Sequence, residues 1–141
     1  MYLTYDATVP TILAVDDRHI AQQEIKYLLA NWCNVQVSNN TGEALNLIYN
    51  RKISLMSVNS SMSQPDGIEL CRTVRSISQF RELPIIMLTP SDNFVNKVKC
   101  KLAGATDYIT TPYAPTTLKQ IVSKYLSMNT SDNTKSQVYQ L

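Results

Sequence analysis

Histidine and cysteine, which build most zinc sites and many nucleophilic sites, are scarce in this sequence of 141 residues. His19 is the only histidine, and the three cysteines, Cys33, Cys71 and Cys100, lie far apart. They form no CxxC pair, and no histidine lies at the spacing of a zinc ligand. His19 also has no evident nucleophile partner, so we expect a protein that is not an enzyme. We predict buried or free thiols in a reducing cytoplasm.

The sequence also lacks a strong charge and a long apolar run. Its formal net charge is only +2, which gives no bulk electrostatic argument for binding nucleic acid. No apolar run approaches the length of a membrane span. The first ten residues, MYLTYDATVP, have neither the basic nor the apolar region of a secretory signal. We therefore expect a soluble cytoplasmic protein that binds neither nucleic acid nor a membrane.

Short apolar runs alternate with helical patterns along most of the chain. Strands are predicted at 11–15, 35–37, 53–58, 84–88 and 107–109, and helices at 18–31, 41–48, 67–78, 92–103 and from 115 onward. Five such repeats predict an α/β fold, (βα)5, with a parallel sheet and helices on both of its faces. We divide the chain into an N-terminal extension at 1–10, a domain at 11–127 and a flexible polar tail at 128–141.

Several residues suit the ends or inner faces of these helices. Thr41 is expected to cap the second helix, and Pro115 to open the last one. Gly104 is expected to end the helix at 92–103 in a left-handed conformation. In the first helix, the predicted inward face is built from four residues, Ala21, Ile25, Leu28 and Leu29.

In a parallel sheet of this kind, function lies at the carboxyl ends of the strands. Asp16 and Asp17 follow the first strand and either bind a hard cation or form an acidic first turn that suits the helix dipole. Asn59 follows the third strand, Thr89 the fourth, and Tyr108 lies in the fifth. Taken singly, these three fit a turn former, a loop-capping hydroxyl and a half-buried aromatic.

Five segments together carry a family resemblance. They are ILAVDD (12–17), NNTGEAL (39–45), MSQPDGIEL (62–70), LPIIMLT (83–89) and GATDYITTPY (104–113). In order and spacing the chain resembles the receiver domain of two-component response regulators, over about residues 11–127. The resemblance implies a flavodoxin-like, doubly wound fold with strand order 2-1-3-4-5.

The receiver family uses five parts for its phosphoryl chemistry. Two acidic residues bind magnesium, an aspartate is phosphorylated, and a hydroxyl and a lysine contact the phosphoryl group. An aromatic residue changes rotamer, and the lysine precedes a proline whose peptide bond is typically cis. The resemblance assigns the acid pair, the switch hydroxyl, the switch aromatic and the cis-proline candidate to five residues of this chain, Asp16, Asp17, Thr89, Tyr108 and Pro112.

Two of the family's positions hold other residues here. Counting back seven residues from Asp66, the phosphoacceptor position is Asn59, a degenerate one because its amide is a poor nucleophile. The lysine position is Thr111, which has no charge to stabilise phosphoryl oxygens. The two changes cancel in formal charge and leave −2 from Asp16 and Asp17. Bulky Pro90 after Thr89 is a third departure.

These departures predict a stand-alone pseudo-receiver that signals by binding proteins, without aspartyl phosphorylation. It would act in a two-component or phosphorelay pathway, and it is a possible homodimer. We expect no cofactor, and at most weak Mg²⁺ binding at Asp16 and Asp17. Slow deamidation of Asn59, which precedes Ser60, would restore an aspartate but not the missing lysine.

The family's signalling face lies on helix 92–103, strand 107–109 and the helix from 115. Besides Tyr108 and Gln120, its expected partner surface here comprises Phe94, Lys97, Lys101, Lys119 and Lys124. As a group they predict a mildly basic surface for an acidic protein partner. The alternative hypothesis is a sensor that binds a small ligand or cation at Asp16, Asp17, Asn59 and Thr89.

Overall fold

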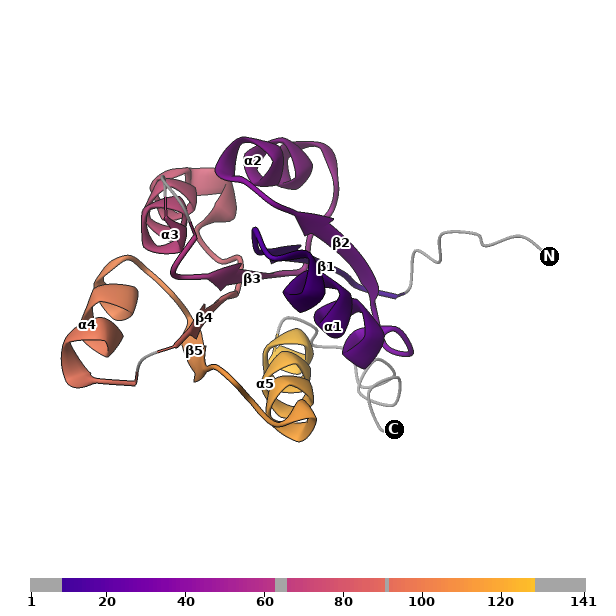
Figure 1. Cartoon of the computed structure of the whole chain (residues 1–141). Helices are drawn as coiled ribbons and strands as arrows, with labels where there is room; N and C mark the ends of the chain where they lie inside the picture. Colours follow the sequence, from indigo (N-terminus) through magenta and orange to yellow (C-terminus); the bar gives the residue numbers. More distant parts are fainter. Residues whose placement is uncertain (1–8, 63–65, 91, 129–141) are drawn as a thin grey trace.

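The computed structural model describes residues 9–62, 66–90 and 92–128, in which strands and helices alternate (Figure 1). The strands are β1 (Thr11–Val15), β2 (Asn34–Ser38), β3 (Leu55–Asn59), β4 (Ile85–Thr89) and β5 (Asp107–Thr110). The helices are α1 (His19–Leu29), α2 (Thr41–Asn50), α3 (Gly67–Ser76), α4 (Phe94–Leu102) and α5 (Pro115–Met128), with a short 3₁₀ turn, η1, at Ser78–Phe80. Most of the predicted N-terminal extension and nearly all of the polar tail lie outside the described residues.

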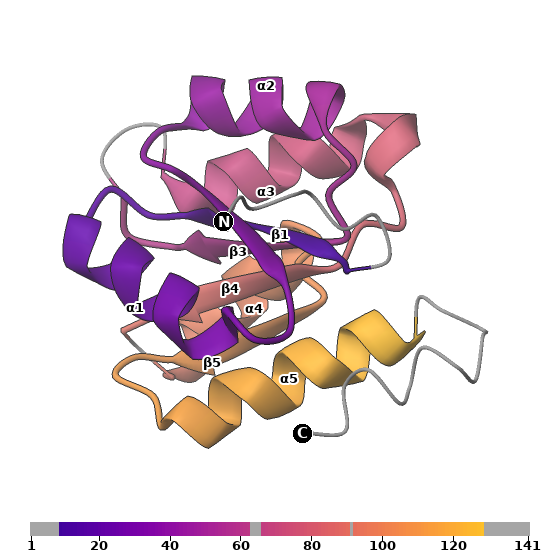
Figure 2. The same cartoon turned by 90° about the vertical axis from the view of Figure 1, so that its right-hand side faces the viewer.

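The five strands form one parallel sheet in the order β2-β1-β3-β4-β5, which confirms the predicted fold. Helices α1 and α5 cover one face of the sheet, and α2, α3 and α4 cover the other (Figure 2). From β1 the chain first moves outward to β2 and then back past β1 to β3. The strand order therefore reverses between β1 and β3, and in folds of this kind the functional site lies at the carboxyl ends of the two strands where the order reverses.

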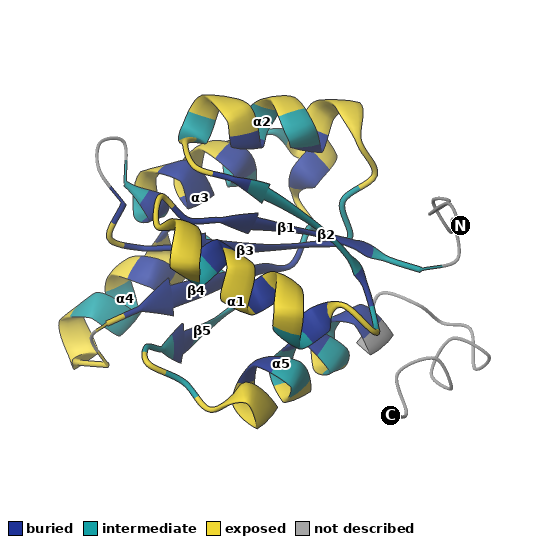
Figure 3. Cartoon of the chain, turned by 45° about the vertical axis from the view of Figure 1, so that its right-hand side comes forward, coloured by how far each residue is buried: buried dark blue, intermediate teal, exposed yellow. Residues whose placement is uncertain are grey.

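The core consists of two apolar layers, one on each side of the sheet. Strands β1, β3 and β4 are buried along their whole length, as expected for strands with helices on both faces (Figure 3). Successive residues of β1 alternate between the layers: Leu13 and Val15 pack toward α2 and α3, whereas Ile12 and Ala14 pack toward α1 and α5. The predicted free, buried cysteines are confirmed.

The ends of the elements differ from the predictions in instructive ways. Asn40, not Thr41, caps α2, because its backbone is extended and its side chain accepts a hydrogen bond from the Glu43 N–H at 2.8 Å. The Glu43 carboxylate in turn accepts from the N–H of Asn39, which completes a reciprocal cap. The third helix stops at Ser76 rather than at 78, and a 3₁₀ turn follows.

The inward face of α1 also differs from the prediction. Gln22 is buried where Ala21 was expected, and Ala21 is only half-buried. The Gln22 amide donates to the backbone oxygens of Asp16 at 2.6 Å and Ser38 at 3.4 Å. A buried amide is acceptable here because these carbonyls satisfy it. Gln22 thus ties α1 to the ends of β1 and β2.

The turn after α4 has the left-handed glycine that was predicted. Gly104 has φ of 102°, and a Cβ there would lie 2.4 Å from Cγ of Arg75. The Arg75 guanidinium donates to the carbonyls of Gly104 and Phe80 and to the Thr106 hydroxyl. Arg75 therefore joins α3, η1 and the start of β5, and burial lowers its pKa. None of the helices in the described part of the chain is long and apolar enough to span a membrane.

Candidate functional site

Polar residues meet at the carboxyl ends of the central strands. Asp16 directly follows β1, Asn59 ends β3 and Thr89 ends β4. All three are buried, with exposed fractions of 1%, 6% and 1%. Because β1 and β3 are neighbours, the Asn59 amide reaches the carboxylate of Asp16 and donates to its Oδ1 at 3.2 Å. We call the cluster of Asp16, Asp17, Asn59 and Thr89 the carboxyl-end pocket.

Arg18 forms the strongest contact in this pocket, and sequence reasoning overlooked it. Its Nε donates to Asp16 Oδ1 at 3.1 Å, and its Nη2 donates to Asp16 Oδ2 at 3.0 Å. The backbone N–H of Arg18 adds a third bond to Oδ1, at 3.0 Å. A guanidinium matches a carboxylate in this two-point geometry. The contact raises the pKa of the Arg18 guanidinium, and the charges of Asp17 and Glu24 act in the same direction.

This ion pair corrects the charge expected for the pocket. The count of −2 from Asp16 and Asp17 omitted Arg18, which neutralises the buried carboxylate. The Asp16 side chain is 1% exposed, whereas the Arg18 side chain is 58% exposed. Arg18 therefore covers the carboxylate on its solvent side. The segment DDR (16–18) could have predicted this ion pair, because an arginine two positions after an aspartate can reach back to it.

The orientation of the Asn59 amide follows from its two partners. Its Oδ1 accepts a hydrogen bond from the Ser61 N–H at 2.9 Å, which leaves the NH₂ group to face Asp16. The reverse orientation would set oxygen against carboxylate and NH₂ against N–H. Gly67 packs directly on this residue, since a Cβ at position 67 would lie 2.1 Å from the Asn59 carbonyl oxygen.

Thr89 is held from the side of α4. The amide of Asn96 donates to the Thr89 hydroxyl, so a second side chain that the sequence did not single out belongs to the pocket. Thr111 hydrogen-bonds through its N–H to the Thr89 carbonyl at 2.8 Å, and it is half-buried. The peptide bond between Thr111 and Pro112 is cis, as the resemblance implied.

Tyr113, next in the chain, extends the pocket toward α1. Burial is the main reason that the pKa of its phenol is raised, followed by the charge of Glu24 and a hydrogen bond with Glu24. Asp16 raises this pKa further, and Arg18 opposes the rise. The phenol thus belongs to the same electrostatic neighbourhood as the Arg18 ion pair.

Tyr108 belongs to β5, and its ring lies beside Lys97 of α4. It is half-buried against the core layer of α2, α3 and α4, and the Lys97 ammonium lies 5.3 Å from its ring centroid. A hydrogen bond with Tyr108 raises the pKa of Lys97. On the other side of β5, the Tyr125 hydroxyl donates to Asp107 at 2.7 Å, which links α5 to the strand.

The predicted partner surface is only partly continuous. Phe94, Lys97 and Lys101 share α4, where Phe94 is 79% exposed. Val95 and Leu102, which the sequence analysis did not name, add further exposed apolar area to α4. On α5, Lys119 lies over the Trp32 ring at 5.9 Å and Lys124 over the Tyr125 ring at 5.1 Å. Lys119 therefore faces the α1 side of α5 rather than α4.

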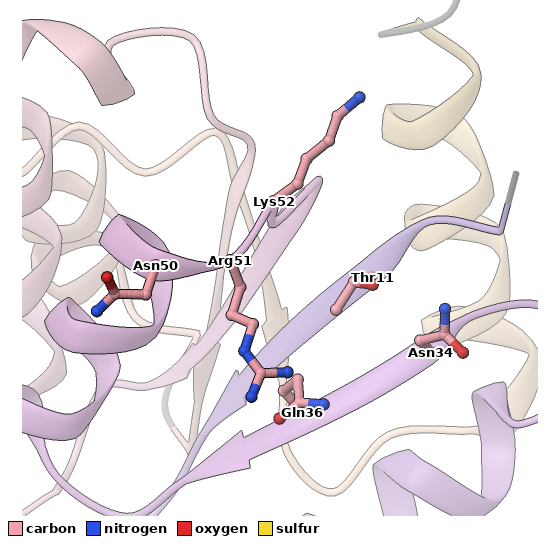
Figure 4. Close-up of a pocket in the computed structure, with 6 residues that line it drawn as sticks. All are labelled: Thr11, Asn34, Gln36, Asn50, Arg51 and Lys52. Carbon is pink, nitrogen blue, oxygen red and sulfur yellow. The ribbon is translucent and has the colours of Figure 1, made fainter. Parts of the chain in front are cut away.

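A separate pocket, formed by residues of polar type, lies at the opposite, amino end of the sheet (Figure 4). It has a volume of about 380 Å³ and is lined by Thr11, Asn34, Gln36, Asn50, Arg51 and Lys52. Arg51 extends toward Gln36, whereas Lys52 points away. None of the predicted site residues lines it.

The donor set of the carboxyl-end pocket does not fit the magnesium site that the family resemblance implies. Magnesium and calcium need oxygen ligands at about 2.0–2.6 Å. Here Oδ1 of Asp16 already accepts three N–H donors, and Asn59 turns its NH₂ group toward the carboxylate. Across residues 9–62, 66–90 and 92–128, no three His, Cys, Asp or Glu side chains are grouped to hold a metal ion.

Comparisons with known proteins agree with this architecture. The family model described as "Response regulator receiver domain" matches residues 12–123. Response regulator MprA of Mycobacterium sp. (strain KMS) is 35% identical over 104 residues, which cover 73% of this chain and 44% of that protein. MprA of Mycolicibacterium vanbaalenii is 32% identical, over 86% of this chain and 52% of its own length. The chain thus spans about half the length of the curated relatives it matches.

Solved structures extend the likeness to three dimensions. The Vibrio cholerae chemotaxis protein CheY4 superposes with a TM-score of 0.79 at 27% identity, covering 83% of this chain and 98% of that one. The receiver domain of Francisella response regulator 1452 gives a TM-score of 0.78 at 28% identity, covering 86% and 99%. The matched segment, the strand order and the cis peptide bond agree with one another, and the chain belongs to the response regulator receiver domain family.

Proposed function

We propose that this receiver domain signals in the cytoplasm by binding protein partners, without phosphorylation at position 59 and without catalysis of its own. The observation that carries the proposal is the state of Asn59. Its amide is a poor nucleophile, and both of its polar atoms are engaged, with Asp16 and with Ser61. An acyl phosphate needs a carboxylate oxygen at this position, and none is present.

The surroundings of Asn59 support the same conclusion. Thr111 offers no positive charge where the family has a lysine, and the Arg18 guanidinium is paired with Asp16. A phosphoryl group carries about two negative charges near neutral pH. It would therefore meet the carboxylates of Asp16 and Asp17, while the Arg18 guanidinium is already paired with Asp16. Loss of one positioned donor typically costs about 3 kcal/mol of transition-state stabilisation.

Output by surface contact is supported by the exposed side of α4. Phe94, Val95 and Leu102 are 79%, 61% and 79% exposed, and Lys99 and Lys101 accompany them. Apolar side chains at the centre of an interface supply binding energy, and surrounding charges select the partner. We propose an acidic protein segment as the partner, and we keep a homodimer as an alternative use of the same surface.

The competing hypothesis, a sensor for a cation or small ligand at the carboxyl-end pocket, has less support. Arg18 and Asn59 engage both oxygens of the Asp16 carboxylate, and the Asn96 amide donates to the Thr89 hydroxyl. A ligand would have to displace at least one of these contacts. The surface of α4 requires no such rearrangement.

Treatment with a small phosphodonor in the presence of MgCl₂ tests the proposal directly. We expect intact-mass spectrometry to find no acid-labile phosphate on the wild-type chain. The matched variant, Asn59→Asp with Thr111→Lys, restores the carboxylate and the ammonium group. Adding Arg18→Met to it frees the Asp16 carboxylate for magnesium, and this triple variant serves as the control for reactivity. Phosphate recovered on any pocket residue of the wild-type chain would contradict the proposal.

A further inference from the structure

The buried carboxylate of Asp16 needs a positive partner. A carboxylate that is 1% exposed is costly unless it is paired and hydrogen-bonded. Arg18 supplies two side-chain bonds and one backbone bond to it, and Asn59 supplies a fourth. Both oxygens of the Asp16 carboxylate are therefore engaged within the chain itself, Oδ1 by three N–H donors and Oδ2 by one.

A divalent cation entering this pocket would meet two obstacles. It would have to remove the Arg18 guanidinium from both oxygens of Asp16 while being repelled by its charge. It would also meet the NH₂ group of Asn59, whose oxygen is held by the Ser61 N–H. The other acidic residue, Asp17, is exposed and not buried like Asp16.

We propose that Arg18 is the resident cation of the carboxyl-end pocket and keeps it closed to divalent metal ions. The inference deepens the proposed function, on which it rests: a pocket that carries its own cation holds the same state whatever the magnesium concentration. Arg18 is a positioning residue here. It acts by holding the Asp16 carboxylate, and its half-exposed side chain covers that carboxylate from solvent.

Removal of the guanidinium should open the pocket. In the full chain, Arg18→Met keeps most of the side-chain length but leaves Asp16 without its cation. We expect saturable binding of Mg²⁺ or Mn²⁺ in calorimetry at millimolar metal. We also expect a thermal midpoint that rises with metal concentration, because a ligand that binds only the folded state stabilises it. The wild-type chain should show neither effect.

Two further variants identify the source of the signal. Arg81→Met removes an exposed arginine that precedes the amino end of β4, opposite the carboxyl-end pocket, and should behave as the wild type. Combining Arg18→Met with Asp16→Asn removes the freed carboxylate and should abolish metal binding again. Wild-type affinity for Mg²⁺ equal to that of Arg18→Met, or no metal binding by a folded Arg18→Met chain, would overturn the inference.

A measurement on the wild-type chain keeps the inference testable even if Arg18→Met does not fold. The backbone N–H of Arg18 lies 3.0 Å from Asp16 Oδ1, so Mn²⁺ bound there would broaden its NMR signal. We expect Mn²⁺ to broaden this signal no more than that of Ser54, at the amino end of the sheet. Selective broadening of the Arg18 signal would contradict the proposal. Phosphodonor labelling tests the proposed function, and metal binding tests the role of Arg18. Either proposal can therefore fail while the other holds.

Discussion

The carboxyl-end pocket and the outer surface of α4 are built in opposite ways. In the pocket, Asp16, Asn59 and Thr89 are buried, and each has a hydrogen-bond partner within the chain. On α4, Phe94 and Leu102 are each 79% exposed. Polar groups are satisfied where the family's chemistry would take place, and apolar groups are exposed where a partner can reach them. The contrast favours recognition over chemistry.

The pocket depends most strongly on the close contact between α3 and β3. Gly67→Ala should destabilise the fold by about 3 kcal/mol, since a Cβ would lie 2.1 Å from the Asn59 carbonyl oxygen and the backbones must separate. Urea denaturation measures the change. Gly42→Ala is the control, because a Cβ there meets its nearest atom at 3.5 Å and alanine favours a helix. An equal loss in both variants would show that the contact with Asn59 is unimportant.

Asn59→Asp should reverse the polarity of one pocket contact. The new carboxylate would replace an N–H donor 3.2 Å from Asp16 Oδ1 with a like charge, and we expect a loss of about 2 kcal/mol at neutral pH. Repulsion should raise the pKa of the new aspartate, so the destabilisation should fade as the pH falls and the carboxylate is protonated. Thermal melts from pH 7 to 4 check this. Asn46→Asp on exposed α2 is the control.

The α4 surface should tolerate substitution without loss of stability but not without loss of binding. Phe94→Ala should weaken capture of an acidic partner about tenfold, or roughly 1.4 kcal/mol, while the melting temperature stays unchanged. Ile20→Ala removes a similarly exposed apolar side chain from α1 and should leave binding intact. A biosensor measures the affinity of each variant for the partner. An equal loss of affinity in both variants would show that the partner binds a different surface.

The smallest expected effect concerns the link between α5 and β5. Tyr125→Phe removes the hydrogen bond to Asp107 and should cost less than about 1 kcal/mol at pH 7. Burial and then this bond raise the pKa of Tyr125 to about 12. Since the phenol is more readily deprotonated in the unfolded chain, the stability that it contributes is lost as the pH rises from about 10 to about 12. The free energy of unfolding of the Tyr125→Phe variant should change less with pH in that range.

The fold was predictable from local patterns, because buried strands and amphipathic helices each have a periodicity of their own. The left-handed turn at Gly104 and the start of α5 at Pro115, both predicted, illustrate this. Arg18 was not found, because a charged residue at the start of a surface helix is usually solvated. Asn96 was not found either, since only the packing of α4 against β4 brings its amide to Thr89.

The residue types at positions 59 and 111 alone predict that the family's nucleophile and lysine are absent, because chemistry of that kind depends on functional groups that no fold can supply. Tertiary structure decided what takes their place. The parallel order of β1 and β3 brings Asn59 against Asp16, and the turn into α1 lets Arg18 fold back over both oxygens. The short distances from Asp16 to Asn59 and Arg18 depend on the strand order and on the path of the chain into α1. Both are properties of the whole fold, so no single residue determines them.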